Sequence, residues 1–275
     1  MASWMYISLI SMLFFKTINK MIVHLFPPPV QLRVQWRKVW LWENLVTSLV
    51  HSIISATLSI YSIYITPSMT RDMINTRNNL LYYTLAISIG YFVYDVIDLS
   101  VNDRQRSLCI IIHHMLVLSS FLLCVIGNKL LPFAIFALLV EVNSIFLHTR
   151  RLMRMSEFDP NGVAFKINRV LLVITFISFR FISCVWVTIR LVINQHAINR
   201  FIFAVGFGGL CIAIVQNFFL LQQLWSSDVK SSNDHISQTQ NRKTAVERDY
   251  NANKRSGSED LKDILRMTNT CHPTE

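Results

Sequence analysis

Two adjacent histidines, His113 and His114, lie near the middle of an apolar stretch of 19 residues (108–126) in this 275-residue sequence. Asp95 lies in the preceding apolar stretch and Glu141 in the following one. Imidazole and carboxylate groups that meet in a medium of low dielectric constant can transfer protons, and their pKa values shift strongly there. We therefore interpret His113, His114, Asp95 and Glu141 as a candidate catalytic cluster.

Other polar side chains also interrupt the apolar stretches. A charged group in the middle of a membrane-spanning helix costs roughly 2.5–3.5 kcal/mol on insertion scales, so such residues usually face the interior of the bundle. Glu141 is seven residues before His148, two helical turns along the same face. We predict that this second group contributes to lipid or acyl-chain binding, and its members are His51, Asp98, Asn143, His148 and Arg180.

A structural interpretation stands beside the functional one. Polar groups in different helices can pair and hold a bundle together, and we favour this reading for His51. For Arg180 it predicts an ion pair with Glu141 or a phosphate contact at the interface. Asp98 lies one turn after Asp95 and could simply end its helix at the membrane surface.

The sequence argues against metal and cofactor chemistry. A di-iron membrane oxygenase needs about eight histidines in spaced boxes, but no His-x-x-His-His occurs here. Four of the eight histidines lie before the triple proline, in a loop or in the tail, namely His24, His196, His235 and His272. There is also no Gly-rich phosphate loop, no Gly-x-Ser-x-Gly and no zinc-spaced Cys/His set. We predict no metal and no resident cofactor.

The elements that position these residues are predicted to be membrane helices. The chain is 52% hydrophobic and 15% charged, whereas soluble proteins average about 25% charged residues. A spanning helix needs about 20 mostly apolar residues. Six stretches qualify, namely 45–65, 80–97, 108–126, 130–147, 170–189 and 201–224. The predicted fold is an all-α polytopic transmembrane bundle of six to seven spanning helices that enclose a cavity with a polar end.

The seventh helix depends on the N-terminus. Residues 4–15 resemble the apolar region of a signal peptide, but no Ala-x-Ala site follows and the apolar character continues to Phe26, before Pro27–Pro29. We therefore favour an uncleaved first helix whose Lys16 and Lys20 reach the interface, over a cleaved peptide.

The distribution of charge predicts orientation. Residues 225–275 contain eight basic and eight acidic residues, so the whole net charge of +10 belongs to residues 1–224. The basic residues flank apolar stretches instead of forming a nucleic-acid-binding face. With seven helices, nine flanking basic residues fall on one side and five on the other, and the positive-inside rule makes the first side cytosolic. The nine are Arg33, Arg37, Lys38, Arg104, Arg106, Arg150, Arg151, Arg154 and Lys166, and the five are Arg71, Arg77, Lys129, Arg190 and Arg200.

The domain organisation follows from these boundaries. We predict an N-terminal helix with a Pro-rich linker over residues 1–35, a transmembrane domain over 36–225, and a disordered cytosolic tail over 226–275.

Several of these stretches together resemble one family. They are 40–45 (WLWENL) with 48–52 (SLVHS), Gly90-Tyr91-Phe92 with Asp95 and Asp98, the double histidine, and 138–147 (LLVEVNSIFL). This combination resembles the TLC domain, most closely the calfacilitin-like TLC-domain proteins and more distantly the ceramide synthases. The resemblance implies a regulator of phospholipid acyl composition and membrane fluidity. Such a protein limits the incorporation of polyunsaturated chains, has phospholipids or acyl chains as partners, and resides in the plasma membrane or, alternatively, the endoplasmic reticulum.

Two alternative functions remain open. Ceramide synthases imply an acyltransferase that uses acyl-CoA, but they carry a His-Asp pair and a further Asp where this chain has Glu141, Val142, Asn143 and Ser144. This departure favours a non-enzymatic protein. The other alternative is a channel-modulating or receptor-like subunit. The residues leave open whether the partner is a second copy of the chain or another membrane protein.

Overall fold

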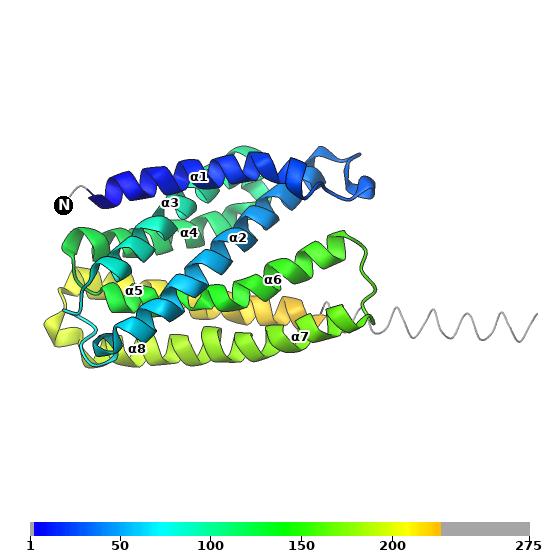
Figure 1. The fold of residues 1–275 in the computed structure, drawn as a ribbon. Helices are drawn as coiled ribbons and strands as arrows, with labels where there is room; N and C mark the ends of the chain where they lie inside the picture. Colours follow the sequence, from blue (N-terminus) through cyan, green and yellow to red (C-terminus); the bar gives the residue numbers. More distant parts are fainter. Residues whose placement is uncertain (1–2, 227–275) are drawn as a thin grey trace, which may run out of the picture. The chain divides into compact units, whose positions relative to one another are not determined.

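A computed structural model of the chain describes residues 3–226, all of them in helices, turns or connections without a strand (Figure 1). Two compact units are distinguished, Met1–Phe218 and Phe219–Glu275, and residues 219–226 are the described part of the second. The predicted tail therefore lies outside the described residues, apart from Ser226.

Seven helical segments in this part of the chain are long and apolar enough to span a membrane, which confirms the predicted fold class. The first four are single helices, the fifth and sixth are each interrupted, and the seventh is Arg200–Ser226. The helices are α1 (Ser3–Leu25), α2 (Trp36–Ile65), α3 (Asn79–Asn102), α4 (Arg104–Gly127), α5 (Leu131–Leu138), α6 (Val140–Met155), α7 (Val163–Thr175) and α8 (Ser183–Ile193). Short 3₁₀ turns η1 (Val30–Leu32), η2 (Pro67–Thr70) and η4 (Gln195–Ala197) lie in the connections.

The helices extend beyond the apolar stretches that predicted them. The predicted segment 130–147 continues to Met155 through three arginines, and α2 begins nine residues before the predicted position 45. Long basic side chains can keep their apolar stems along the helix and place their charges at the membrane surface. Hydropathy therefore detects only the part of each helix that lies within the hydrocarbon.

The first helix packs closely against α3. A Cβ atom at Gly90 of α3 would collide with the Ser8 carbonyl oxygen and lie 2.6 Å from Ser11 Cβ. The hydroxyl groups of the same two serines donate to the carbonyl oxygens of Ala86 (2.8 Å) and Ile87 (2.7 Å). Small residues and hydroxyls at a contact of this kind are typical of helix pairs in membranes.

Helix α2 is a central packing element. It contacts α1, α3, α5 and α6, and Figure 1 shows it crossing the other helices at an angle. Its buried face carries polar and small residues at spacings of three or four, namely Asn44, Ser48, His51, Ser52, Ser55, Ser59 and Ser62. This stripe lets neighbouring helices approach and supplies hydrogen-bonding groups to the bundle interior.

Two of the spanning segments are interrupted, and each interruption changes the direction of the side chains that follow it. The fifth span is divided at Leu139 into α5 and α6, and Leu130 enters α5 with a left-handed backbone (φ 64°). The sixth contains a π-helical segment, η3 (Phe176–Ile182), between α7 and α8. A π-helical turn holds one more residue than an α-helical turn, and such segments frequently lie at functional sites.

Candidate functional site

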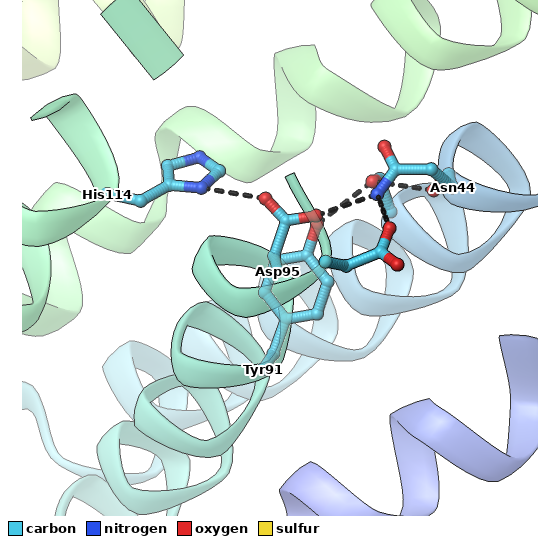
Figure 2. A network of polar contacts seen from close by, with 6 residues as sticks. Asn44, Tyr91, Asp95 and His114 are labelled. Carbon is cyan, nitrogen blue, oxygen red and sulfur yellow. Dashed lines mark hydrogen bonds and ion pairs between the residues drawn. The ribbon is translucent and has the colours of Figure 1, made fainter. Parts of the chain in front are cut away.

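Asp95 of α3 is the centre of a buried polar network between α2, α3 and α4. Its side chain faces His114, whose Nδ1 atom lies 2.8 Å from Asp95 Oδ2. On the other side the Asn44 amide donates one hydrogen bond to Asp95 Oδ1 (2.9 Å) and another to Asp98 Oδ2 (3.1 Å) (Figure 2). Asp95 is only 2% exposed, so these contacts replace its hydration.

Asp98 belongs to the same network and does not end its helix, because α3 continues to Asn102. The Trp40 indole donates to Asp98 Oδ2 (3.0 Å), and the Asn102 amide donates to Asp98 Oδ1 (2.9 Å). We call this group the acidic network, and its members are Trp40, Asn44, Asp95, Asp98, Asn102 and His114.

His51 lies beside the network but in a different environment. Its ring stacks on Tyr91 with centroids 3.6 Å apart, and its Nε2 atom is 2.8 Å from Ser55 Oγ. Tyr91 in turn donates to Ser48 Oγ (2.9 Å). His51 is 1% exposed and also contacts the Phe15 ring. The structure therefore places His51 in the packed interior, as the structural interpretation expects.

The two adjacent histidines point in different directions, as a rotation of 100° per residue requires. His114 faces Asp95, whereas His113 lines a cavity. The double histidine thus connects the acidic network to the cavity through two neighbouring positions of α4.

The cavity has a volume of about 180 Å³. Helices α3, α4, α5, α6, α8 and the last helix all contribute to its walls, which are mostly apolar. The two ionisable side chains other than cysteine that line it are His113 and Glu141, and Glu141 Oε2 accepts a hydrogen bond from Ser52 Oγ (2.7 Å). The cavity therefore combines apolar walls with an imidazole and a carboxyl group.

Arg180 forms a second polar centre, supplied by η3, α6 and the last helix. Its Nε donates to Asn143 Oδ1 (2.7 Å), Nη1 to Asn217 Oδ1 (2.9 Å) and Nη2 to Ser144 Oγ (3.1 Å). We call Asn143, Ser144, Arg180 and Asn217 the arginine cluster. The expected ion pair with Glu141 is not among the ion pairs of residues 3–226, because neutral oxygens take up the guanidinium.

Asn143 is fixed from a second direction. Its Nδ2 donates to the Leu172 carbonyl and to Thr175 Oγ1, both at 3.0 Å. The amide oxygen is consequently aimed at Arg180. Asn143 thus acts in the described structure as an interhelical anchor between α6, α7 and η3.

His148 lies on α6 beyond Glu141 and differs from the other histidines. Its Nδ1 atom is covered and has no hydrogen-bond partner among residues 3–226. The ring interacts electrostatically with Arg151, Asp95 and Arg180, so His148 lies near both polar centres without a hydrogen bond at Nδ1 to either.

Sequence reasoning predicts Asn143 but misses Asn44 and Asn217, the other amides of the two centres, and it uses Asn44 and Trp40 only as part of a family-like stretch. A signal exists for Asn44, since it begins the polar stripe of α2 at helical spacing. Asn217 follows Gln216 in the apolar last helix, where amide side chains can hydrogen-bond across helices.

The arrangement favours proton chemistry and hydrogen bonding over metal binding. No three His, Cys, Asp or Glu side chains in the described part of the chain come together closely enough to hold a metal ion. A carboxylate facing an imidazole, as Asp95 faces His114, fixes the orientation of the ring. The acidic network therefore holds an oriented imidazole one residue from His113, which lines the cavity.

Comparison with known proteins identifies relatives over most of the chain. The family model of the TLC domain matches residues 41–229. TLC domain-containing protein 2 of Danio rerio is 34% identical over 216 residues, which cover 78% of this chain and 86% of that protein. TLC domain-containing protein 1 of Gallus gallus is 29% identical over 59% of this chain and 64% of its own. No solved structure matches.

Proposed function

The chain belongs to the TLC-domain family of membrane proteins linked to lipid metabolism, and on that premise we propose that it holds an acyl chain of a membrane lipid in its cavity. By retaining some acyl chains and releasing others it would regulate phospholipid acyl composition. Limiting the incorporation of polyunsaturated chains would in turn regulate membrane fluidity.

The observation that carries this proposal is the composition of the cavity. Its walls are apolar, and its volume of about 180 Å³ slightly exceeds that of a 150 Å³ engineered cavity that binds benzene. A space of this size accommodates a segment of an acyl chain, not a complete phospholipid. His113 and Glu141 offer hydrogen bonds to the polar end of such a chain, as ligand sites with few polar groups do.

The proposed setting is the plasma membrane, with the endoplasmic reticulum as the alternative. An odd number of spans supports a placement of the two ends of the chain on opposite sides of the membrane. The positive-inside distribution supports a cytosolic C-terminal tail.

Replacing the two ionisable cavity residues tests the proposal. His113→Gln combined with Glu141→Gln keeps an uncharged polar side chain at both positions, preserves the shape of the glutamate, and removes charge and proton exchange. We expect cells that lack the endogenous protein to recover a normal phospholipid acyl profile with the wild type but not with this variant. The matched control is His196→Gln, which changes an exposed histidine of η4. Equal rescue by the cavity variant and the control, at equal expression, would contradict the proposal.

The acyltransferase alternative has one specific observation in its favour. The Asp95–His114 pair resembles a general base with its orienting carboxylate, and the adjacent His113 faces the cavity. In acyl transfer from acyl-CoA, the base accepts the proton of an acceptor amine or hydroxyl. The acceptor atom then forms a bond to the acyl carbon, and the CoA thiolate leaves.

Incubation of the purified protein with labelled acyl-CoA and amine or lysophospholipid acceptors decides between the two functions. A labelled product that disappears in His114→Ala supports the transferase. Binding of acyl lipid without any product supports the regulator.

A further inference from the structure

The two carboxyl oxygens of Glu141 have different surroundings. Oε2 accepts a hydrogen bond from Ser52 Oγ of α2 at 2.7 Å, and Ser52 is only 1% exposed. Oε1 has no hydrogen-bond partner among residues 3–226, yet it is not covered by neighbouring atoms. Since Glu141 lines the cavity, one oxygen is held in the packed interior and the other is open to the cavity.

The hydroxyl groups in the cavity wall do not supply a donor for this open oxygen. Ser120 and Ser183 both line the cavity. Ser120 donates to the Leu116 carbonyl oxygen (3.0 Å), and Ser183 donates to the Phe136 carbonyl oxygen (3.2 Å). A hydroxyl group has a single hydrogen to donate, so both serines present only lone pairs to the cavity.

Arg180 brings a positive charge near Glu141 without a described hydrogen bond to it. The two side chains interact electrostatically, but all three guanidinium nitrogen atoms donate to the neutral oxygens of the arginine cluster. An ionised carboxyl group accepts hydrogen bonds and donates none. The open oxygen of Glu141 is therefore an acceptor towards which a ligand in the cavity can direct a donor.

We propose that Glu141 Oε1 accepts a hydrogen bond from a hydroxyl group of a single-chain lipid in the cavity, and that Ser52 is the positioning residue that directs this oxygen. The inference rests on the proposed function and names the chemical class of the lipid's polar end. A hydroxyl group supplies the missing donor, whereas an ether oxygen has no hydrogen to donate. An acceptor placed against Glu141 leaves the carboxyl oxygen desolvated without a partner, which is unfavourable.

The chain contains a matched control for Ser52. Ser59 lies seven residues later on the same buried face of α2. It is 0% exposed, and its hydroxyl is covered without a partner among the described residues. The two serines thus share helix, burial and side chain, and they differ in the hydrogen bond to Glu141.

A competition between two uncharged probes tests the inference. The full-length protein in detergent is equilibrated with equal amounts of oleyl alcohol and oleyl methyl ether, and the retained probes are quantified by mass spectrometry. The probes share one chain and differ only in the replacement of the hydroxyl hydrogen by a methyl group. We expect about tenfold enrichment of the alcohol, the equivalent of one hydrogen bond to a charged group.

Serine variants separate positioning from packing. Ser52→Ala should bring the ratio of the two probes towards one while the amount of retained ether stays unchanged, because only the direction of the carboxyl group is lost. Ser52→Thr keeps a hydroxyl group and should keep the preference. Ser59→Ala should keep the wild-type ratio. A purely structural role of Ser52 would instead lower the retention of both probes together with the Tm.

Glu141→Gln provides an independent test that does not depend on the serines. The amide oxygen can still accept from Ser52, and the amide nitrogen then faces the cavity with two N–H donors. The preference for the alcohol should disappear, because the ether oxygen can accept from this amide as well as the alcohol oxygen can.

The outcomes distinguish this inference from the proposed function. Equal retention of alcohol and ether by the wild type, or an unchanged ratio in Glu141→Gln, overturns the hydroxyl site while acyl-chain binding itself stands. An unchanged ratio in Ser52→Ala overturns the positioning role. Retention of neither probe by the wild type counts against the proposed function. Glycerol identifies the source of the hydroxyl group: if it displaces oleyl alcohol at equal concentration, the site recognises a soluble polyol and the lipid assignment is overturned.

Discussion

The acidic network and the arginine cluster differ in how they satisfy a buried charge. In the acidic network two carboxylates accept hydrogen bonds from amide and indole N–H groups, and one of them faces an imidazole. In the arginine cluster one guanidinium donates to two amide oxygens and one hydroxyl. The first combines carboxyl and imidazole groups, whereas the second is centred on a guanidinium, which stays charged.

This difference indicates which centre contributes to stability and which to function. The Arg180 guanidinium, with three neutral acceptors, joins α6, η3 and the last helix, and its described hydrogen bonds are all interhelical. In the acidic network, the donors that Asp98 meets among the described residues are neutral, and His113, next to His114, lines the cavity. We infer that the arginine cluster mainly provides stability and the acidic network mainly provides function.

The largest expected effect comes from removing the guanidinium. Arg180→Met retains an unbranched apolar side chain but leaves Asn143, Ser144 and Asn217 without their donor. Interhelical hydrogen bonds in membranes contribute about 0.6 kcal/mol each on average, so three lost bonds should destabilise the protein by about 2 kcal/mol. Thermal unfolding in detergent measures the change. Arg180→Lys keeps the charge but not the planar fork, and a Tm equal to that of wild type in both variants would remove the distinction between the two centres.

Neutralising the central carboxylate should have a smaller effect on stability and a larger effect on function. Asp95→Asn can still accept from Asn44 but no longer provides a negative charge for His114. We expect a loss of about 1 kcal/mol together with loss of rescue in the cellular acyl-profile assay. If Asp95→Asn destabilises more than Arg180→Met while retaining rescue, the assignment of roles is reversed.

Filling the cavity should leave both polar centres intact. The only atom near a Cβ at Gly209 would be Ser120 Oγ, 3.9 Å away, an ordinary contact, and the Leu side chain of Gly209→Leu would enter the space between α4 and the last helix. Replacing a helical glycine removes a penalty of about 0.8–1 kcal/mol, so stability should stay equal or rise slightly. Retained acyl lipid should fall several-fold. Gly208→Leu, with open space at that position, is the control, and equal lipid retention in both variants would contradict the location of the acyl chain.

The smallest expected effect concerns the ion pair between Arg37, in the first turn of α2, and Asp103, which lies between α3 and α4. The Arg37 guanidinium, through its hydrogen bonds, holds the pKa of Asp103 below the ordinary value of 3.8. A lowered folded-state pKa gives a stabilisation that is present above the ordinary value and is lost as the pH falls through the folded-state value. Asp103→Asn should therefore unfold slightly below wild type at about pH 6, and the difference should shrink as the pH falls below 3.8. A difference that grows towards acid pH would show that Asp103 is not stabilised by Arg37.

Much of the architecture could be predicted from the sequence because the bilayer imposes a simple rule. Apolar stretches of about 20 residues located the spans, but the side-chain directions of the two histidines needed the structure, which places His113 at the cavity and His114 against Asp95. The polar residues within the stretches located the region of both centres. The family resemblance was confirmed by the matching domain and relatives.

The partners within each centre could not be predicted for two physical reasons. Hydropathy does not say which helices are neighbours, so the sequence predicts Glu141 or a phosphate as the partner of Arg180, whereas Asn143, Ser144 and Asn217 accept its hydrogen bonds. Neutral amides also carry no charge that would mark them among apolar residues. Asn44 nevertheless donates to Asp95, and Asn217 accepts from Arg180. The predicted roles of the site residues, the cytosolic tail and the membrane compartment stay predictions.

The π-helical segment Phe176–Ile182 also has a consequence for how the sixth span can change during evolution. Its extra residue sets the part before it and the part after it about 100° out of phase. Deletion of one residue there, for example the exposed Ile177, would restore a regular helix but rotate Ser183, Cys184 and Val187 away from the cavity. The helical phase of the second part of this span is therefore independent of that of the first part. A homologous sequence that lacks the π-helical segment should align with this chain only with a one-residue gap at this point.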